Sequence, residues 1–288
     1  MISTPTVSVL MTTYNREKYI TEAIDSVLNS TFKNFELIIV DDGSSDNTVS
    51  IALEFQKRDP RIKVYVNSRN LGDYPNRNKA AEYATGKYIK YLDSDDTIKP
   101  WGLEYCVHEM EKYPEAAMGI SYYNASANSE SELLQPAEAI DKHFNSKGFL
   151  FVGPSGTIIK RDVFEEYKGF DTRFGVASDN FFNIRTASKY NILLFKRDFF
   201  FYRIHPNQER NNEVKYLVYN YNYLKEVLDN IQLPMSSTLI EYHKKKLNKR
   251  FGVNLVKYFI KRWSISELNH ILKQTKFKVY DLFHGLLV

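Results

Sequence analysis

Apolar and polar residues follow two repeating patterns along the first hundred residues of the chain. Short, mainly apolar runs are typical of buried strands, whereas apolar residues spaced three or four apart favour amphipathic helices. The predicted strands are Val7–Met11, Phe35–Val40, Ile62–Val66 and Tyr88–Leu92. The predicted helices between them are Ile20–Leu28, a segment through Val49 and Leu53, and Asn76–Ala84.

The alternation of strands and helices predicts an α/β fold, a Rossmann-like, mostly parallel sheet with helices on both faces. Residues 124–148 have the composition of a loop or insertion, and residues 149–205 return to mixed strand and helix patterns. From Glu213 onward the pattern is helical and rich in Tyr, Lys and Leu. We therefore expect a main domain at 1–212 and a helical extension at 213–288, basic and amphipathic.

Polar residues follow three of the predicted strands directly. The clusters are Thr12–Asn15, Asp41–Ser44 and Asp93–Asp96. Parallel sheets bind their ligands beyond the carboxyl ends of their strands, and these ends lie at one edge of the sheet. The sequence therefore predicts a ligand site where the three clusters meet.

Composition excludes several classes of protein. The 288 residues are 43 % hydrophobic and 26 % charged, which is ordinary for a globular chain. The single cysteine, Cys106, cannot form an intrachain disulfide. No run approaches the ~18 apolar residues of a membrane span, and the first residues do not resemble a signal peptide. We expect a cytoplasmic protein.

The net charge of +4 is unevenly placed. Eight basic residues and no acidic one lie between Lys244 and Arg262, which leaves 31 basic against 35 acidic residues elsewhere. Apolar residues recur every four positions in the same segment, at Leu247, Phe251, Leu255, Phe259 and Trp263. Two interpretations stay open: peripheral docking of 244–263 on the inner face of the cell membrane, or packing on the main domain with a solvated basic face. No nucleic-acid partner is expected.

The cluster Asp93, Asp95 and Asp96 carries the clearest chemical signal. Carboxylates this close repel one another unless a cation or a proton neutralises them. Oxygen ligands suit Mg²⁺ or Mn²⁺, although a solvated acidic turn is the simpler alternative. The sequence lacks the glycine motifs of Rossmann dehydrogenases and of P-loop enzymes, which disfavours both classes.

Six motifs in order resemble those of the family 2 inverting glycosyltransferases, which have the GT-A fold. The resemblance covers roughly residues 5–205. The motifs are Thr12–Asn15, Phe35–Asp46, Asn70–Gly72, Arg77–Asn78, Ala84–Ile89 and Leu92–Asp96.

The resemblance implies roles for individual residues. Thr12, Tyr14 and Asn15 would line the base pocket, Asp42 would read the uracil imide, and Arg77 and Asn78 would contact the donor. Asp93 begins the D-x-D motif, Asp95 and Asp96 would hold ribose and the metal-bound diphosphate, and Arg203 and His205 would lie near that diphosphate, with His205 as a further metal ligand. Asp179 aligns with the catalytic base. Departures from the family pattern are Ser178, Pro75–Asn76 and Ala80, which bear on acceptor shape and donor-loop geometry.

The implied activity is an inverting, Mn²⁺- or Mg²⁺-dependent glycosyltransferase of the hexosyltransferase type. It would move a sugar from a nucleotide sugar, most simply a UDP-sugar, to a hydroxyl of a saccharide or lipid-linked saccharide in bacterial surface polysaccharide or glycoconjugate synthesis. Two alternatives stay open. A haloacid-dehalogenase-type phosphatase would use Asp93 as nucleophile in the run Asp93–Thr97, and a non-catalytic module would only bind nucleotide sugars.

Overall fold

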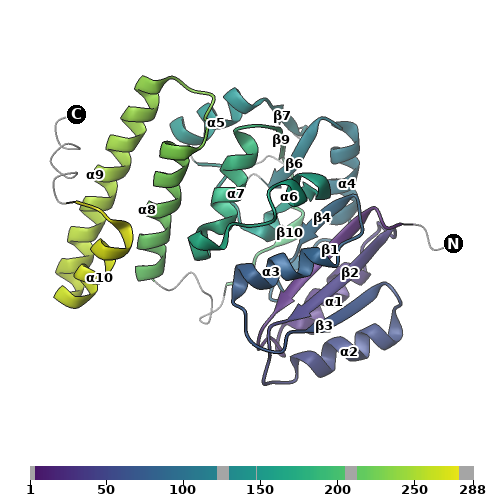
Figure 1. The fold of residues 1–288 in the computed structure, drawn as a ribbon. Helices are drawn as coiled ribbons and strands as arrows, with labels where there is room; N and C mark the ends of the chain where they lie inside the picture. Colours follow the sequence, from purple (N-terminus) through teal and green to yellow (C-terminus); the bar gives the residue numbers. More distant parts are fainter. Residues whose placement is uncertain (1–3, 122–129, 147, 205–212, 279–288) are drawn as a thin grey trace.

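The computed structural model describes residues 4–121, 130–146, 148–204 and 213–278 (Figure 1). Its main sheet has the strand order β3-β2-β1-β4-β8-β6-β9-β7. β3, β2, β1 and β4 are parallel, as are β6 and β9, whereas β8 and β7 run antiparallel to their neighbours. The strands are β1 (Val7–Thr13), β2 (Phe35–Asp41), β3 (Ile62–Val66), β4 (Tyr88–Tyr91), β6 (Ala116–Ser121), β7 (Glu132–Leu134), β8 (Thr157–Lys160) and β9 (Asn191–Phe195).

Helices cover both faces of this sheet because successive strand residues point to opposite sides. Val9 and Met11 of β1 belong to one buried cluster, and Leu10 between them belongs to the other. On the first face lie α1 (Ile20–Leu28), α2 (Thr48–Arg58) and α4 (Gly102–Lys112). On the second lie α3 (Asp73–Glu82), α5 (Pro136–Asn145), α6 (Arg161–Glu166) and α7 (Ser178–Ala187). The predicted α/β class with helices on both faces is confirmed.

The carboxyl ends of β1, β2 and β4 meet at one edge of the sheet. Thr13 pairs with Asp41 in the parallel register, and the backbone N–H of Asp42 donates to the carbonyl of Thr13 at 2.8 Å. A small second sheet joins β5 (Thr97–Ile98) to β10 (Phe200–Phe201), which brings the segment after β10 to the residues that follow β4. The three polar clusters therefore share an edge, as the sequence predicts.

Some local predictions are wrong. α3 begins at Asp73 and includes Pro75, because proline is tolerated in the first helical turn, where its missing N–H has no partner. Asn15, a residue type common at helix N-caps, does not cap α1, which begins at Ile20. It adopts a left-handed conformation (φ 51°) instead. The described part of 124–148 is not all loop, since it holds β7 and α5, and α5 starts with a capping box of Gln135 and Glu138.

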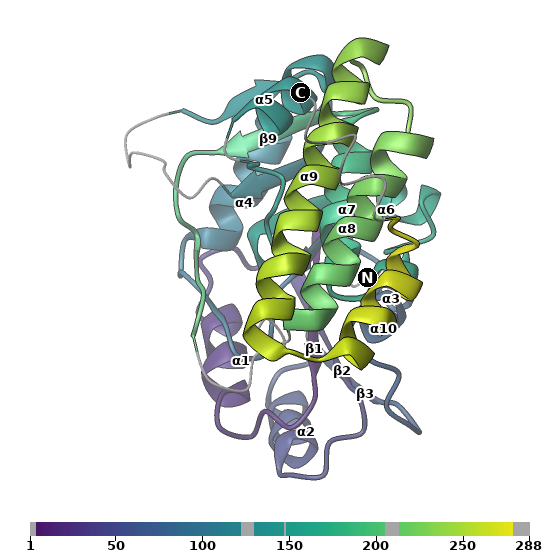
Figure 2. The ribbon, with the colours of Figure 1, turned by 90° about the vertical axis from the view of Figure 1, so that its left-hand side faces the viewer.

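The C-terminal region is helical, as predicted, with α8 (Glu213–Asn230), α9 (Ser237–Arg262) and α10 (Ile265–Thr275) standing beside the sheet (Figures 1 and 2). α8 packs on two sides. Tyr223 and Val227 join the core of the main domain, whereas Val218 and Tyr221 join a second cluster with α9 and α10. The predicted domain boundary at 213 stays a prediction. α8, which begins there, packs both against the main domain and against α9 and α10.

The predicted apolar stripe of the basic segment is used mostly inside the molecule. Phe251 and Leu255 are buried in the second cluster, and Leu247 packs against it. Only Trp263, at the end of α9, is well exposed. The stripe as predicted is therefore a packing face, and none of the helices in the described residues is long and apolar enough to cross a bilayer.

Gly86, just before β4, tests how tightly this sheet edge is packed. A Cβ at this position would lie 2.6 Å from the backbone N of Ser8 and 2.8 Å from the carbonyl carbon of Val7. We predict that Gly86→Ala destabilises the protein by about 1–3 kcal/mol, because strand backbone cannot move aside. Denaturant unfolding measures the change. Gly153→Ala is the matched control, since its Cβ would come no closer than 3.9 Å to another group, and equal stability of the two variants would contradict the prediction.

Candidate active site

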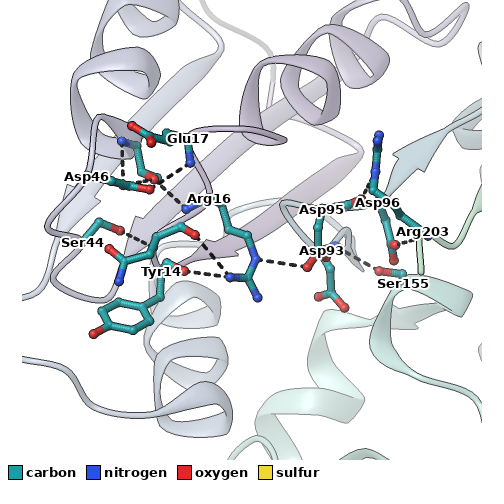
Figure 3. A network of polar contacts seen from close by, with 12 residues as sticks. Tyr14, Arg16, Glu17, Ser44, Asp46, Asp93, Asp95, Asp96, Ser155 and Arg203 are labelled. Carbon is teal, nitrogen blue, oxygen red and sulfur yellow. Dashed lines mark hydrogen bonds and ion pairs between the residues drawn. The ribbon is translucent and has the colours of Figure 1, made fainter. Parts of the chain in front are cut away.

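Three carboxylates lie together at the end of β4. Asp93, Asp95 and Asp96 each offer an oxygen, and these oxygens are within 4.8 Å of one another. Two arginines offset part of this charge, and Figure 3 shows one of them, Arg16, beside the three carboxylates. Arg16, from the loop after β1, reaches Asp95 at 3.0 Å, and Arg77 of α3 reaches Asp93 at 2.6 Å. The protein itself therefore supplies counter-charge to two of the three carboxylates.

Asp96 differs from Asp93 and Asp95 because its hydrogen bond in the described residues comes from a backbone N–H and not from an arginine side chain. Its side chain is 1 % exposed, and Oδ1 accepts a hydrogen bond from the backbone N–H of Arg203 at 3.0 Å. Oδ2 is buried and has no hydrogen-bond partner among the described residues. Burial and the nearby Asp93 raise the pKa of Asp96 to about 7. An all-oxygen donor set with one orphaned buried oxygen fits a divalent cation such as Mg²⁺ or Mn²⁺.

Arg203 connects the cluster to the segment after β10. Its Nε donates to the backbone carbonyl of Asp95 at 2.9 Å, and its guanidinium also pairs with Glu22 of α1. Arg203 thus lies at the carboxylate cluster, where the resemblance placed it. His205 lies outside the described residues.

The residues expected to bind the base lie at the ends of β1 and β2. Asp42 accepts hydrogen bonds from Asn67 Nδ2 (2.9 Å), the N–H of Leu71 (2.8 Å) and the N–H of Gly72 (2.9 Å). A carboxylate has about four acceptor positions, so one remains for a further donor. Asp42 therefore shapes the loop before α3 and keeps acceptor capacity.

The loop after β1 is fastened to the loop after β2. The backbone N–H of Asn15 donates to Ser44 Oγ at 2.8 Å, and Asn15 Oδ1 accepts from the N–H of Ser45 at 2.9 Å. Thr12 is half-buried, whereas the Tyr14 side chain is 46 % exposed. An exposed ring beside a fixed loop offers a stacking surface for a flat base.

Asn78, for which the resemblance implied a donor contact, has a structural role in this fold. Its Nδ2 donates to the carbonyl of Phe170 at 2.9 Å, and its Oδ1 accepts from the N–H of the same residue at 2.8 Å. Both ends of the amide are occupied by one backbone unit. Asn78 therefore fastens α3 to the turn before α7.

Asp179 lies in the first turn of α7. Its side chain is 8 % exposed and accepts hydrogen bonds from the N–H of Asn180 at 2.7 Å and from the Tyr74 hydroxyl. Burial outweighs these bonds and the nearby Arg77 cation, and it raises the pKa of Asp179 to about 7. A carboxyl group with this pKa exchanges a proton readily near neutral pH.

One short segment connects Asp179 with the carboxylate cluster. A Cβ on Gly153 would lie 3.9 Å from Asp179 Oδ2, and Ser155 Oγ accepts from the N–H of Asp93 at 3.0 Å. Lys90, fully buried in β4, holds this segment by donating to the carbonyl of Ser155 at 2.6 Å. Burial lowers the pKa of Lys90 to about 8. The segment 153–156 thus lies between the two acidic sites.

Sequence reasoning missed three residues that shape this site. Arg16 immediately follows the Thr12–Asn15 cluster at a strand end, so its position in the sequence could have indicated that it belongs to the site. Tyr74 and Lys90 carry no such signal, because a tyrosine in a helix and a lysine in a strand are ordinary on a surface. Both are buried here by contacts that are distant in sequence.

Comparison with known proteins identifies the class. The model of the family described as "Glycosyl transferase family 2" matches residues 8–168. An uncharacterised glycosyltransferase of Haemophilus influenzae is 30 % identical over 313 residues, covering 100 % of this chain and 96 % of that protein. The chain belongs to glycosyltransferase family 2. A β-1,3-glucosyltransferase of Campylobacter jejuni, named for the acceptor GalNAc(5)-diNAcBac-PP-undecaprenol, is 30 % identical over 59 % of this chain and 56 % of its own.

Solved structures support the GT-A fold. Residues 1–349 of Staphylococcus aureus TarS in complex with UDP superpose with a TM-score of 0.72 at 19 % identity, covering 97 % of this chain and 80 % of that one. The mannosyltransferase PcManGT of Pyrobaculum calidifontis, in complex with GDP-Man and Mn²⁺, has a TM-score of 0.62 at 15 % identity, covering 99 % and 87 %. The fold predicted from the motifs is confirmed, and the protein is a glycosyltransferase by family.

Asn78→Ala tests the structural role of Asn78. We predict a loss of stability of about 2–4 kcal/mol, because a buried backbone N–H and carbonyl lose their partners. We predict that UDP affinity stays within twofold of the wild type. Thermal unfolding and calorimetry measure the two quantities. Asn145→Ala, which removes an exposed amide from α5, is the control. A stable variant with much weaker UDP binding would instead support the donor contact that the resemblance implied for Asn78.

Proposed function

We propose that this protein transfers a sugar from a UDP-sugar to an acceptor hydroxyl with inversion at the anomeric carbon, and that Asp179 is the general base. The observation that carries the proposal is the arrangement of two acidic sites on either side of segment 153–156. One is a single carboxylate with a pKa near neutrality, and the other is a cluster of three. A single base and a leaving group on the opposite side are what an inverting displacement needs.

In the proposed reaction, the acceptor oxygen attacks the anomeric carbon from the face opposite the diphosphate. Asp179 takes the proton of that hydroxyl as the new glycosidic bond forms, and the bond from the anomeric carbon to the diphosphate oxygen breaks with its electron pair. Tyr74 holds the Asp179 carboxyl group by its hydrogen bond. Because this carboxyl is buried, solvent does not compete for the proton.

The leaving diphosphate is assigned to the carboxylate cluster. Asp95 and Asp96 would hold a divalent cation, which supplies charge stabilisation to the departing diphosphate. Arg77 keeps Asp93 in place, and Arg16 does the same for Asp95. TarS and PcManGT have been solved with UDP and with GDP-Man and Mn²⁺ respectively, which supports nucleotide and metal chemistry at this fold without choosing between Mn²⁺ and Mg²⁺.

The uracil base is assigned to the ends of β1 and β2. The remaining acceptor position of Asp42 would take the imide N–H, and the exposed Tyr14 ring would stack on the base. Thr12 and Asn15 complete the pocket wall. In this assignment, uracil and diphosphate would lie along the edge of the sheet, and Asp179 would lie on the far side of the diphosphate from the uracil.

The acceptor is assigned to a groove beside α7. It has a volume of about 1010 Å³ and lies between α5, α8 and α9. Asn180, next to Asp179, lines one end, and Tyr223 and Arg250 line the wall. Burial raises the pKa of Tyr223 well above its usual value, and the charges of Asp179 and Arg250 are both near enough to act on it. Rings and a cation suit a saccharide that carries an anionic group.

Family membership and fold argue against the phosphatase alternative. The first 92 residues, which a phosphatase would leave without a role, build β1–β4 and α1–α3 of the GT-A sheet. Asp93, the supposed nucleophile, is paired with Arg77. A module that binds nucleotide sugars without turnover is the other alternative, and UDP binding without transfer to any acceptor would favour it.

The Asp96→Asn variant tests the metal assignment. We predict that UDP affinity in the presence of Mn²⁺ falls at least tenfold, because a neutral amide is a poor ligand for a hard cation. Calorimetry with and without Mn²⁺ measures the affinity. Asp59→Asn, which alters an acid paired with Arg61 at the end of α2, is the control. Undiminished UDP affinity in Asp96→Asn would contradict the assignment.

The Asp179→Asn variant tests the base. We predict roughly 100-fold slower transfer with unchanged UDP affinity and folding, since an amide cannot accept the proton of the hydroxyl. The wild-type rate should also rise with pH up to about 7 and then level off, because the base acts only when it is deprotonated.

Three readouts separate the outcomes for Asp179→Asn: melting temperature, UDP affinity and rate of transfer. A folded variant with near-normal transfer would move the base elsewhere. Loss of folding would make Asp179 a structural residue.

A further inference from the structure

The side of α9 that faces away from the molecule is apolar and exposed. Its large apolar residues are between 44 % (Val253) and 76 % (Trp263) exposed. Successive members are eleven, three, four and three residues apart, and at 3.6 residues per turn this places them along one side of the helix. These residues are Tyr242, Val253, Val256, Ile260 and Trp263. We call this set, with the cations described below, the outer face of α9.

The opposite side of the helix already has a partner. Phe251, Leu255 and Tyr258 are buried against α8 and α10. Figures 1 and 2 show α9 at the margin of the molecule, and no other labelled helix or strand lies over it in the second view. The outer face is therefore additional to the packing face, and within the described residues it is left open.

The segment of α9 that carries these apolar side chains contains cations and no acidic residue. The sequence from Tyr242 to Ser266 contains no Asp or Glu. Two cations on this side, Lys245 and Lys249, are exposed and form no ion pair with a carboxylate in the described part of the chain. Lys246, Arg250 and Lys257 are exposed as well, and they lie at the border of this side because they also line the groove assigned to the acceptor. A set of exposed cations and apolar residues attracts an anionic surface that also has an apolar interior.

Trp263 combines an unusual backbone conformation with a highly exposed side chain. It ends α9 in the left-handed conformation (φ 50°), where glycine is the usual residue. This conformation costs free energy for a residue with a Cβ. It leaves the indole the most exposed of the large apolar side chains in the described residues, at 76 %. Tryptophan favours the boundary between lipid headgroups and acyl chains.

We propose that the outer face of α9 docks this protein on an anionic lipid bilayer, with the helix lying in the plane of the interface. Ile260 and Trp263 enter the acyl boundary, and the lysines remain among the headgroups. A second copy of this chain is a poor occupant of the face, because a two-fold contact would place unpaired cations against identical cations. Of the stripe predicted from the sequence, Trp263 belongs to this outer face, whereas Phe251 and Leu255 are buried on the other side of the helix. Val253, Val256 and Ile260 were not part of that stripe.

The test measures binding of the full chain to phosphatidylcholine vesicles with and without phosphatidylglycerol. We expect binding only to the anionic vesicles, weakening steeply at high salt because surface charges are screened. The double variant Ile260→Glu/Trp263→Glu should bind at least tenfold more weakly. Replacing Lys245 and Lys249 by Gln should cost roughly fivefold for each lysine.

The control is Val66→Glu on β3. Val66 is 53 % exposed, and Figure 1 shows β3 on the opposite side of the molecule from α9. This variant should bind vesicles like the wild type. All variants change exposed side chains, so their melting temperatures should agree. Equal binding by Ile260→Glu/Trp263→Glu and the control would overturn the proposal, as would absence of wild-type binding to anionic vesicles at low salt.

Fluorescence reports on Trp263 directly. The chain has two tryptophans, so Trp101→Phe leaves Trp263 as the only one. Its emission should shift to the blue on anionic vesicles and stay unchanged on neutral ones. A wild-type dimer in solution that Ile260→Glu/Trp263→Glu dissociates would instead assign the face to a second copy and overturn lipid docking. Neither measurement needs a donor or an acceptor, so the result is independent of the proposed transfer.

Discussion

Mutual repulsion among the carboxylates at the end of β4 is the constraint that organises this edge of the molecule. Two like charges 4 Å apart repel by about 1 kcal/mol in water and about 4 kcal/mol near a protein surface. The chain offsets this with Arg16 from the end of β1 and Arg77 from α3. The segment after β10 adds a backbone N–H on Asp96. Parts of the chain that are far apart in sequence must therefore meet before the cluster is tolerated.

The same constraint sets the position of α3. Tyr74 and Arg77 lie about one turn apart on this helix, and they contact Asp179 and Asp93 respectively. Asn78, next to Arg77, fastens α3 to the turn at Phe170 just before α7. One helix thereby determines the spacing between the single carboxylate and the cluster. In the proposed reaction, that spacing is the distance between base and leaving group.

The features that sequence could predict are those with local causes. Apolar runs indicated the central strands, and the ends of those strands indicated where the polar clusters meet. The features that the sequence left open or did not indicate depend on distant partners. The amide of Asn78 is used by Phe170, and Phe251 and Leu255 face α8, although their spacing equally suited a membrane. Periodicity identifies an amphipathic helix, but it does not identify what covers its apolar side.

The family match ends at residue 168, before Asp179 and before every residue of α8 and α9. The matched part holds the residues assigned to nucleotide and diphosphate except Arg203. The groove assigned to the acceptor is walled largely by residues beyond 168, including Tyr223 and Arg250. Because the donor side is built from the shared segment and the acceptor side mostly from the C-terminal helices, family membership defines the reaction class without defining the acceptor. Arg250 lines the groove and also belongs to the cationic side of α9, so a chain docked on a bilayer through α9 would hold this groove next to the lipid surface.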